Sequence, residues 1–245
     1  MILPIDKINL VKFLTPVGNI TDKCVLKFAE DRIYTLAATP DTNIILYACA
    51  SLKNTFESVP VRVNIADVKK LLTGIDCFDS DLSFTLADNH IYCSTTTASG
   101  EYFKYYLVDD SIIKEYPLNI NKITSLNFDT IFDIDRKKLA EISKGSSYAR
   151  ATQKIYFFCR DNKVYAELND HAYQNIDNIT FQVTGQYEGE MISTMLPLDL
   201  EIFRILNSLK CETVKVKINN QNKVVMFTVN DGDLELKYII STLVK

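Results

Sequence analysis

Few residues in this chain have the types and spacing that chemistry requires. The two histidines, His90 and His171, each follow an Asn and Asp pair in a polar turn and supply neither a catalytic triad nor a metal ligand set. The acidic segment 75–81, IDCFDSD, lacks the central Gly and final Glu of a calcium-binding EF-hand loop. No G-x-x-x-x-G-K-[ST] motif for nucleotide hydrolysis occurs. We therefore expect a protein that is not an enzyme and binds no metal and no cofactor.

The cysteines and the overall charge further limit the classes of protein to which this chain can belong. Six cysteines are scattered without CxxC spacing, which predicts buried free thiols instead of a zinc site or a disulfide framework. A net charge of -4 and a pI near 5.3 argue against a protein that holds nucleic acid by bulk electrostatics. Any contact with DNA must be local or topological.

The hydropathy pattern predicts a protein without a membrane partner. The chain of 245 residues is 47% hydrophobic and 24% charged, which is typical of one large or two smaller globular domains. No run approaches the ~20 apolar residues of a membrane helix, and the start, MILPIDKINLVKFL, lacks the order of a signal peptide. We expect a cytoplasmic protein, which would be in the host cytoplasm if the protein is viral.

Short β-branched strands dominate both halves of the chain, and apolar residues at helical spacing predict helices in only a few places. The first runs from Asp6 to about Leu14, with Pro16 as its stop. The others are expected over 64–74, from Asp135 to about Ser143 with Gly145 as its end, and from Pro197 to Lys210.

These elements recur at an offset near 130 residues, as Lys7 does against Lys137 and Arg32 against Lys163. The order is helix, three strands, helix, three strands in each half, with an added strand near 126–134 in the second half. This pattern predicts an internal duplication. We expect an N-terminal module at 1–110, an ordered connector at 111–124 that is too apolar for a free linker, and a C-terminal module at 125–245.

The segment VLKFAEDRIYTLAATPDTNIILYACASL, followed by VRVNIADVKKLLTGI, has paired strands and then a strand that leads into a helix and an acidic turn. Together with the duplication, this order resembles the DNA polymerase sliding clamps, and the resemblance covers essentially the whole chain. Bacterial beta clamps have three such modules per chain, whereas the eukaryotic, archaeal and tailed-bacteriophage clamps have two. The length of this chain matches the two-module group, and its details are most similar to the tailed-phage clamps.

The resemblance implies an α+β DNA-clamp fold, in which each of two duplicated modules has antiparallel sheets and two helices on one face. It implies a homotrimeric ring that encircles duplex DNA without reading its sequence. The function it implies is a processivity factor that tethers a DNA polymerase and other clients and is opened by a separate clamp loader ATPase.

The resemblance also implies three sets of site residues. The polar sides of the helices would face DNA phosphates, through Lys7, Lys12, Lys69, Lys70, Arg136, Lys137, Lys138, Lys144, Arg150 and Arg204. The connector and last strand would form a groove for a partner peptide, lined by Val108, Ile112, Tyr116, Leu118, Tyr238 and Ile239. Edge strands over 101–108 and 178–185 would join subunits, through Tyr102, Phe103, Tyr105, Thr180, Phe181 and Val183.

Each set has an ordinary structural explanation beside the functional one. A single lysine can simply solvate the outer face of an amphipathic helix, and only the helix at 135–143 is distinctly basic. Several groove residues could be core. Two other classes also fit the pattern: a structural or assembly protein built from duplicated β-rich modules, and a checkpoint-type clamp subunit that assembles with different chains.

Overall fold

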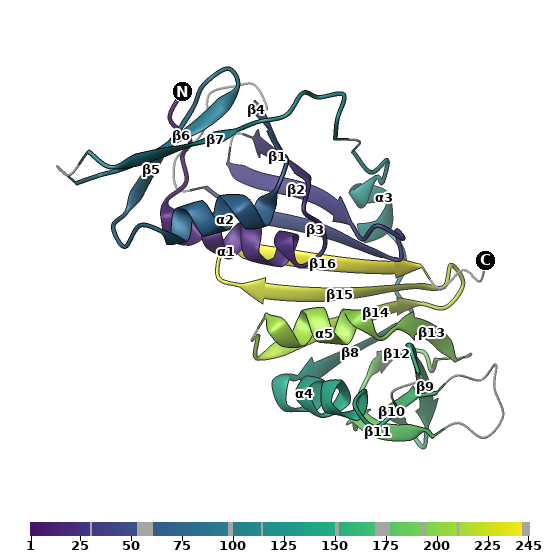
Figure 1. Cartoon of the computed structure of the whole chain (residues 1–245). Helices are drawn as coiled ribbons and strands as arrows, with labels where there is room; N and C mark the ends of the chain where they lie inside the picture. Colours follow the sequence, from purple (N-terminus) through teal and green to yellow (C-terminus); the bar gives the residue numbers. More distant parts are fainter. Residues whose placement is uncertain are drawn as a thin grey trace. The chain divides into compact units, whose positions relative to one another are not determined.

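The computed structural model describes residues 1–29, 31–52, 61–97, 100–113, 115–149, 152–169, 177–192, 195–209 and 211–241. The chain forms two compact units (Figure 1). Unit 1 comprises residues 1–118 with 232–235, and unit 2 comprises residues 119–231 with 236–245. The expected connector is divided between them, because residues 111–118 belong to unit 1 and 119–124 to unit 2.

Unit 1 contains two antiparallel sheets and two helices that pack against each other (Figure 1). One sheet has the order β4-β1-β2-β3 and the other β5-β6-β7, and α1 also contacts β3. The elements are α1 (Lys7–Gly18), β1 (Cys24–Ala29), β2 (Arg32–Ala38), β3 (Ile44–Ser51), β4 (Val61–Ile65), α2 (Val68–Asp76), β5 (Leu82–Leu86), β6 (His90–Thr95) and β7 (Tyr102–Tyr106).

Helix α1 begins where the sequence predicts but ends later. The Asp6 carboxylate caps it by accepting a hydrogen bond from the backbone N–H of Asn9 at 2.8 Å. Pro16 was expected to stop the helix, yet it lies inside the last turn, and the prediction was wrong. Proline removes one intrahelical hydrogen bond, and the burial of Pro16 and Val17 offsets that loss.

Helix α2 begins four residues later than predicted. Asn64 and Ile65 belong to β4, where they pair with Val25 and Cys24 of β1. The helix starts only after Asp67, whose side chain accepts a hydrogen bond from the N–H of Lys70. The apolar residues of the strand happen to continue the helical spacing, so periodicity alone placed the boundary too early.

Unit 2 repeats this architecture with an additional leading strand. One sheet has the order β13-β9-β10-β11, the other includes β12-β8-β14-β15-β16, and α4 packs against α5. The elements are α3 (Ile120–Thr124), β8 (Thr130–Asp135), α4 (Arg136–Gly145), β9 (Lys154–Arg160), β10 (Lys163–Leu168), β11 (Ile179–Thr184), β12 (Glu188–Gly189), β13 (Leu196–Asp199), α5 (Glu201–Ser208), β14 (Thr213–Asn219), β15 (Val224–Asp231) and β16 (Leu234–Ser241).

The predicted helix start at Pro197 was wrong. Pro197 lies in β13 opposite Tyr156 of β9, and the neighbouring Leu196 and Leu198 are buried by strand alternation. Helix α5 begins at Glu201, whose N–H donates to the Asp199 carboxylate at 2.9 Å. A short strand thus precedes the second helix of each unit, as β4 precedes α2.

The order of elements confirms the internal duplication and the α+β class. The expected three strands between the two helices of each half are corrected, because the described residues form four in unit 1 and five in unit 2. Helices α1 and α4 begin at Lys7 and Arg136, and strands β2 and β10 begin at Arg32 and Lys163. The added strand, β8, precedes α4 as predicted. Each unit has its own aromatic core: Phe13, Phe28 and Phe84 are fully buried in unit 1, and Phe157, Phe203 and Phe227 in unit 2.

Candidate functional site

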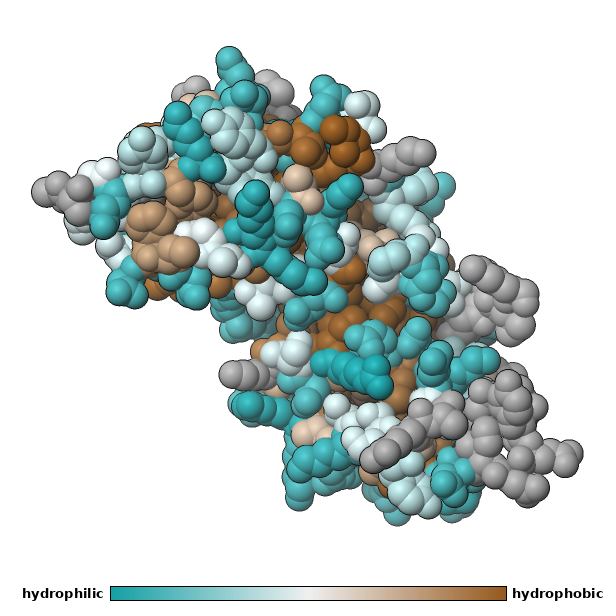
Figure 2. Space-filling model, viewed as in Figure 1, coloured by the Kyte–Doolittle hydropathy of each residue, from teal (hydrophilic) through white to brown (hydrophobic). Residues whose placement is uncertain are grey.

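The most basic helix surface belongs to α4. Asp135 caps this helix by accepting from the N–H of Lys138 at 2.7 Å, and Leu139 and Ile142 are buried. Arg136, Lys137 and Lys144 are exposed. Hydrophilic residues cover most of α4 on the face shown in Figure 2. This helix therefore presents cations to solvent from one side.

Acidic neighbours reduce the positive charge of this surface. Lys138 Nζ lies 2.5 Å from the Glu141 carboxylate, and the lysine lowers the pKa of that carboxyl. Arg136 Nη1 lies 3.8 Å from Glu212. On α5, Arg204 Nη1 lies 2.9 Å from Glu201. Arg150, which was expected on the same face, lies outside the described residues.

The helices of unit 1 present fewer cations than the sequence suggested. Lys69 is exposed and forms an ion pair with Asp22 at 3.0 Å, Lys70 is exposed, and Lys12 is half-buried. Ile8 of α1 is 72% exposed and interrupts the polar surface. The face formed by α1 and α2 is therefore only weakly basic.

The placement of Lys7 corrects one expectation. Its Nζ donates to the backbone carbonyl of Phe78 and, at 3.5 Å, to that of Ser80. The ammonium group therefore holds the loop between α2 and β5 and is not directed into solvent. Helical position alone could not reveal these carbonyl partners, which lie about 70 residues away in the sequence.

The two expected association strands lie at sheet edges. Strand β7 ends the β5-β6-β7 sheet, and β11 ends the sheet that contains β10, β9 and β13. Edge strands leave backbone N–H and C=O groups available for pairing with another chain. Tyr102 and Tyr106 of β7 are 55% and 63% exposed, and Thr180 of β11 is exposed.

A phenylalanine of each edge strand packs on a helix glycine. A Cβ atom built on Gly74 of α2 would lie 2.9 Å from Phe103 Cε2, and one built on Gly145 of α4 would lie 2.6 Å from Phe181 Cζ. Both rings are half-buried. The sequence suggested these glycines only as helix ends, so their role in seating the edge strands was missed.

Two of the expected association residues are buried within the chain. The hydroxyl of Tyr105 donates to the backbone carbonyl of Asp67 at 2.9 Å and accepts from its N–H at 2.7 Å. Burial raises the pKa of this phenol. Val183 is also buried. Tyr105 and Val183 therefore support the edge strands from within and expose little surface for a partner.

The expected peptide groove is only partly available. Ile112 is exposed, and Val108, Tyr116 and Leu118 are half-buried in the connector region of unit 1. Tyr238 and Ile239 of β16 are 0% and 3% exposed, so their assignment to a groove surface is corrected. Burial raises the pKa of the Tyr238 phenol, as expected for a core side chain.

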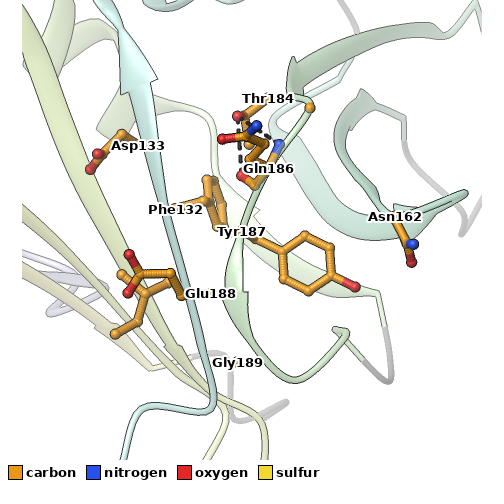
Figure 3. A pocket seen from close by; sticks show the side chains of 10 residues that line it. Phe132, Asp133, Asn162, Thr184, Gln186, Tyr187, Glu188 and Gly189 are labelled. Carbon is orange, nitrogen blue, oxygen red and sulfur yellow. Dashed lines mark hydrogen bonds between the residues drawn. The ribbon is translucent and has the colours of Figure 1, made fainter.

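Unit 2 also contains an open cavity of about 650 Å³ that the sequence did not suggest. It lies beside β8, β12 and the end of β11 (Figure 3). Phe132, Tyr187 and Asn162 contribute to its lining, and Thr184 Oγ1 bonds to the backbone of Gln186 at its rim. The lining contains no nucleophile with an adjacent base.

The described part of the chain offers little support for a metal site or a reactive cysteine. No group of three or more His, Cys, Asp or Glu side chains there could hold a metal ion. Burial raises the pKa of the Cys24 and Cys93 thiols to about 12, which leaves both neutral and unreactive at physiological pH. Within the part of the chain that the structure describes, no helix is long and apolar enough to cross a membrane.

The fold matches that of solved PCNA and DNA polymerase III beta structures. The chain superposes on Proliferating Cellular Nuclear Antigen from Entamoeba histolytica with a TM-score of 0.75 and 14% identity, over 96% of this chain and 95% of that one. A structure of A. fulgidus PCNA bound to the C-terminal region of FEN-1 gives a TM-score of 0.75 and 12% identity, over 100% and 99% of the two chains.

A putative DNA polymerase III beta subunit from Eubacterium rectale gives a TM-score of 0.77 and 15% identity, over 98% of this chain but only 65% of that chain. No family model and no curated protein matches the sequence. These similarities confirm the DNA-clamp fold with duplicated modules that the sequence predicted.

Proposed function

We propose that this protein is a sliding clamp, a processivity factor that encircles duplex DNA as a homotrimeric ring of the tailed-phage type. In this function the chain is not an enzyme. It tethers a DNA polymerase and other clients, and a separate clamp loader ATPase opens it. The observation that carries the proposal is the clamp fold itself, combined with two edge strands available for joining copies.

The geometry of the edge strands supports ring formation. Strands β7 and β11 have similar lengths, and each is seated on a helix by a phenylalanine over a glycine. Pairing β7 of one copy with β11 of another would satisfy backbone groups that are otherwise open at both edges. Such pairing would also bring Phe103 and Phe181 of different copies to the same joint.

The charge distribution supports topological retention over tight electrostatic binding. The net charge is -4, and among the described helices α4 presents the most exposed cations. A ring cannot leave DNA sideways, so weak phosphate contacts are sufficient and leave sliding fast. Arg136, Lys137 and Lys144 are the residues best placed to supply these contacts.

The mass of the protein in solution tests whether three copies associate into a ring. Light scattering over a concentration series should give about three times the chain mass of 27.9 kDa. Phe103→Ala should weaken association by at least roughly tenfold, because truncating an aromatic interface anchor costs about 2 kcal/mol. Phe158→Ala, which removes a half-buried ring from the non-edge strand β9, is the matched control. A monomer at every concentration would refute the ring and favour a structural or assembly protein.

Retention on DNA tests the encirclement. Loaded clamp should remain on closed circular DNA and slide off after linearisation, which distinguishes encirclement from ordinary binding. The double variant Lys137→Glu and Lys144→Glu should reduce the retained fraction at low salt. Lys154→Glu with Lys163→Glu reverses the same number of exposed charges on β9 and β10. Equal retention by the two double variants would remove α4 from the DNA-facing surface.

A further inference from the structure

Two cations face each other on the first sheet of unit 1. Lys27 of β1 pairs directly with Arg62 of β4 in the antiparallel register. Like charges directly opposite each other in a sheet are destabilising. An anion placed between them removes this repulsion, so the pair forms a receptor for a carboxylate.

The chain itself supplies that carboxylate. Glu115 Oε2 lies 2.5 Å from Lys27 Nζ, and Glu115 Oε1 lies 2.5 Å from Arg62 Nη1. The two oxygens of one carboxylate thus bind one cation each. The exposed fractions of the Lys27, Arg62 and Glu115 side chains are 26%, 42% and 35%, so water and salt ions can reach all three.

A second attachment lies a few residues earlier in the chain. Asn64 is buried, and its Nδ2 donates to Asp110 Oδ1 at 2.5 Å and to the backbone carbonyl of Val108 at 3.2 Å. The N–H of Val108 donates to the carbonyl of Asn64 at 3.4 Å. Between the two attachments, Ile113 is buried, whereas Ile112 is exposed.

We propose that residues 108–113 and 115–118 form a detachable strap, and that Lys27 and Arg62 are the carboxylate site that fastens it through Glu115. The attachment at Asn64 combines a buried amide with a backbone hydrogen bond, and it acts as the hinge. Its Asp110 is exposed and also lies 4.0 Å from Arg62. The attachment at Glu115 is ionic and partly exposed, so it opens first. Opening exposes Ile113 and returns the two cations of the sheet to solvent.

The strap gives the client surface of the proposed clamp a means of regulation, and this consequence rests on the proposed function. An acidic client segment would compete with Glu115 for Lys27 and Arg62 and so release the strap. Lys27 and Arg62 then act as positioning residues, because they fix the segment that carries Ile112 and Tyr116. High ionic strength should loosen the strap in the same way, since it screens partly exposed ion pairs.

Hydrogen–deuterium exchange on the full chain tests the strap without DNA or client. Glu115→Gln keeps the shape of the side chain and removes its charge, and it should speed exchange across 109–118 roughly tenfold, which corresponds to about 1.4 kcal/mol. Glu141→Gln is the matched control, because it breaks an ion pair of the same 2.5 Å length with 38% exposure on α4. It should leave 109–118 unchanged.

Two further measurements complete the test. Raising ionic strength from about 0.05 to about 0.5 M should speed exchange of 109–118 in the unmodified chain but not in Glu115→Gln. Arg62→Gln removes one of the two cations that hold Glu115, and it should also speed exchange of 109–118. Unchanged exchange in Glu115→Gln, or exchange of the unmodified strap at the rate of an unfolded peptide, would overturn the proposal. Either result leaves the proposed ring untouched, because the ring is judged by mass and retention.

Discussion

Gly189 offers the most direct check of how the short strand β12 is held in unit 2. Its backbone is left-handed, with a φ of +88°, and a Cβ atom there would lie 2.0 Å from the backbone oxygen of Asp129. That oxygen cannot easily move away, because it accepts a 2.6 Å hydrogen bond from the N–H of Glu190. The Thr130 hydroxyl also donates to the Glu190 carbonyl at 2.6 Å. Gly189→Ala should therefore force β12 away from β8.

The loss of unfolding free energy expected for Gly189→Ala has two contributions. A left-handed conformation costs an L residue about 1 to 2 kcal/mol relative to glycine. Overpacking against neighbours that must shift costs about 1 to 3 kcal/mol more. Gly189→Ala should thus lower the free energy of unfolding by about 2 to 5 kcal/mol.

Gly100 provides the matched control. It is also left-handed, with a φ of +66°, but a Cβ atom there would meet nothing within 4 Å among the described residues. Gly100→Ala should lose only the conformational contribution of about 1 to 2 kcal/mol. The difference between the two variants, about 1 to 3 kcal/mol, isolates the contact with Asp129.

Urea unfolding measures both variants. The chain has no tryptophan, so tyrosine fluorescence and far-UV circular dichroism serve as signals. Because the chain has two compact units, each unit is fitted with its own transition when the two signals do not coincide. Equal destabilisation by Gly189→Ala and Gly100→Ala would refute the close approach of Asp129 to β12.

Two other stability effects follow from named contacts. Tyr105→Phe should lower the free energy of unfolding of unit 1 by about 1 to 3 kcal/mol, because the backbone N–H and C=O of Asp67 lose their hydrogen bonds to the phenol hydroxyl. An unchanged urea midpoint would argue against both hydrogen bonds. Burial raises the pKa of Cys24 and Cys93 from 9.0 to about 12, so the stability that neutral thiols confer is complete below pH 9 and is lost between about pH 9 and 12. Urea midpoints measured from pH 8 to 10.5 should fall, and Cys24→Ala should have a shallower fall than the unmodified chain; identical slopes would show that Cys24 is not the responsible group.

The repeat was predictable from sequence because it depends on element order and not on element boundaries. Starts such as Arg32 and Lys163 mark equivalent strands, and they keep their offset even though the halves share little sequence identity. The predicted helix starts were wrong where a strand leads directly into a helix. The segments ending at Ile65 and Asp199 place apolar residues on alternate positions that also fit part of a helical stripe.

The candidate site was less predictable, because it depends on contacts that are distant in the sequence. A basic helix at 136–145 is visible in the sequence itself. The carbonyl partners of Lys7 and the full burial of Tyr238 are not, since they arise from packing between elements far apart in the chain. The seating of Phe103 on Gly74 likewise requires knowing that β7 passes α2.

The proposed joint has a further consequence for assembly. Strands β7 and β11 occupy different positions of the duplicated module, so pairing between them joins unlike surfaces of two copies. Unlike surfaces make a head-to-tail contact, which closes into a ring only when the rotation per copy divides a full turn, and otherwise grows as an open filament. Concentration dependence separates these cases: a closed trimer reaches a constant mass, whereas a filament continues to grow. A mass that keeps rising with concentration would retain the edge-strand pairing but refute encirclement of DNA as its purpose.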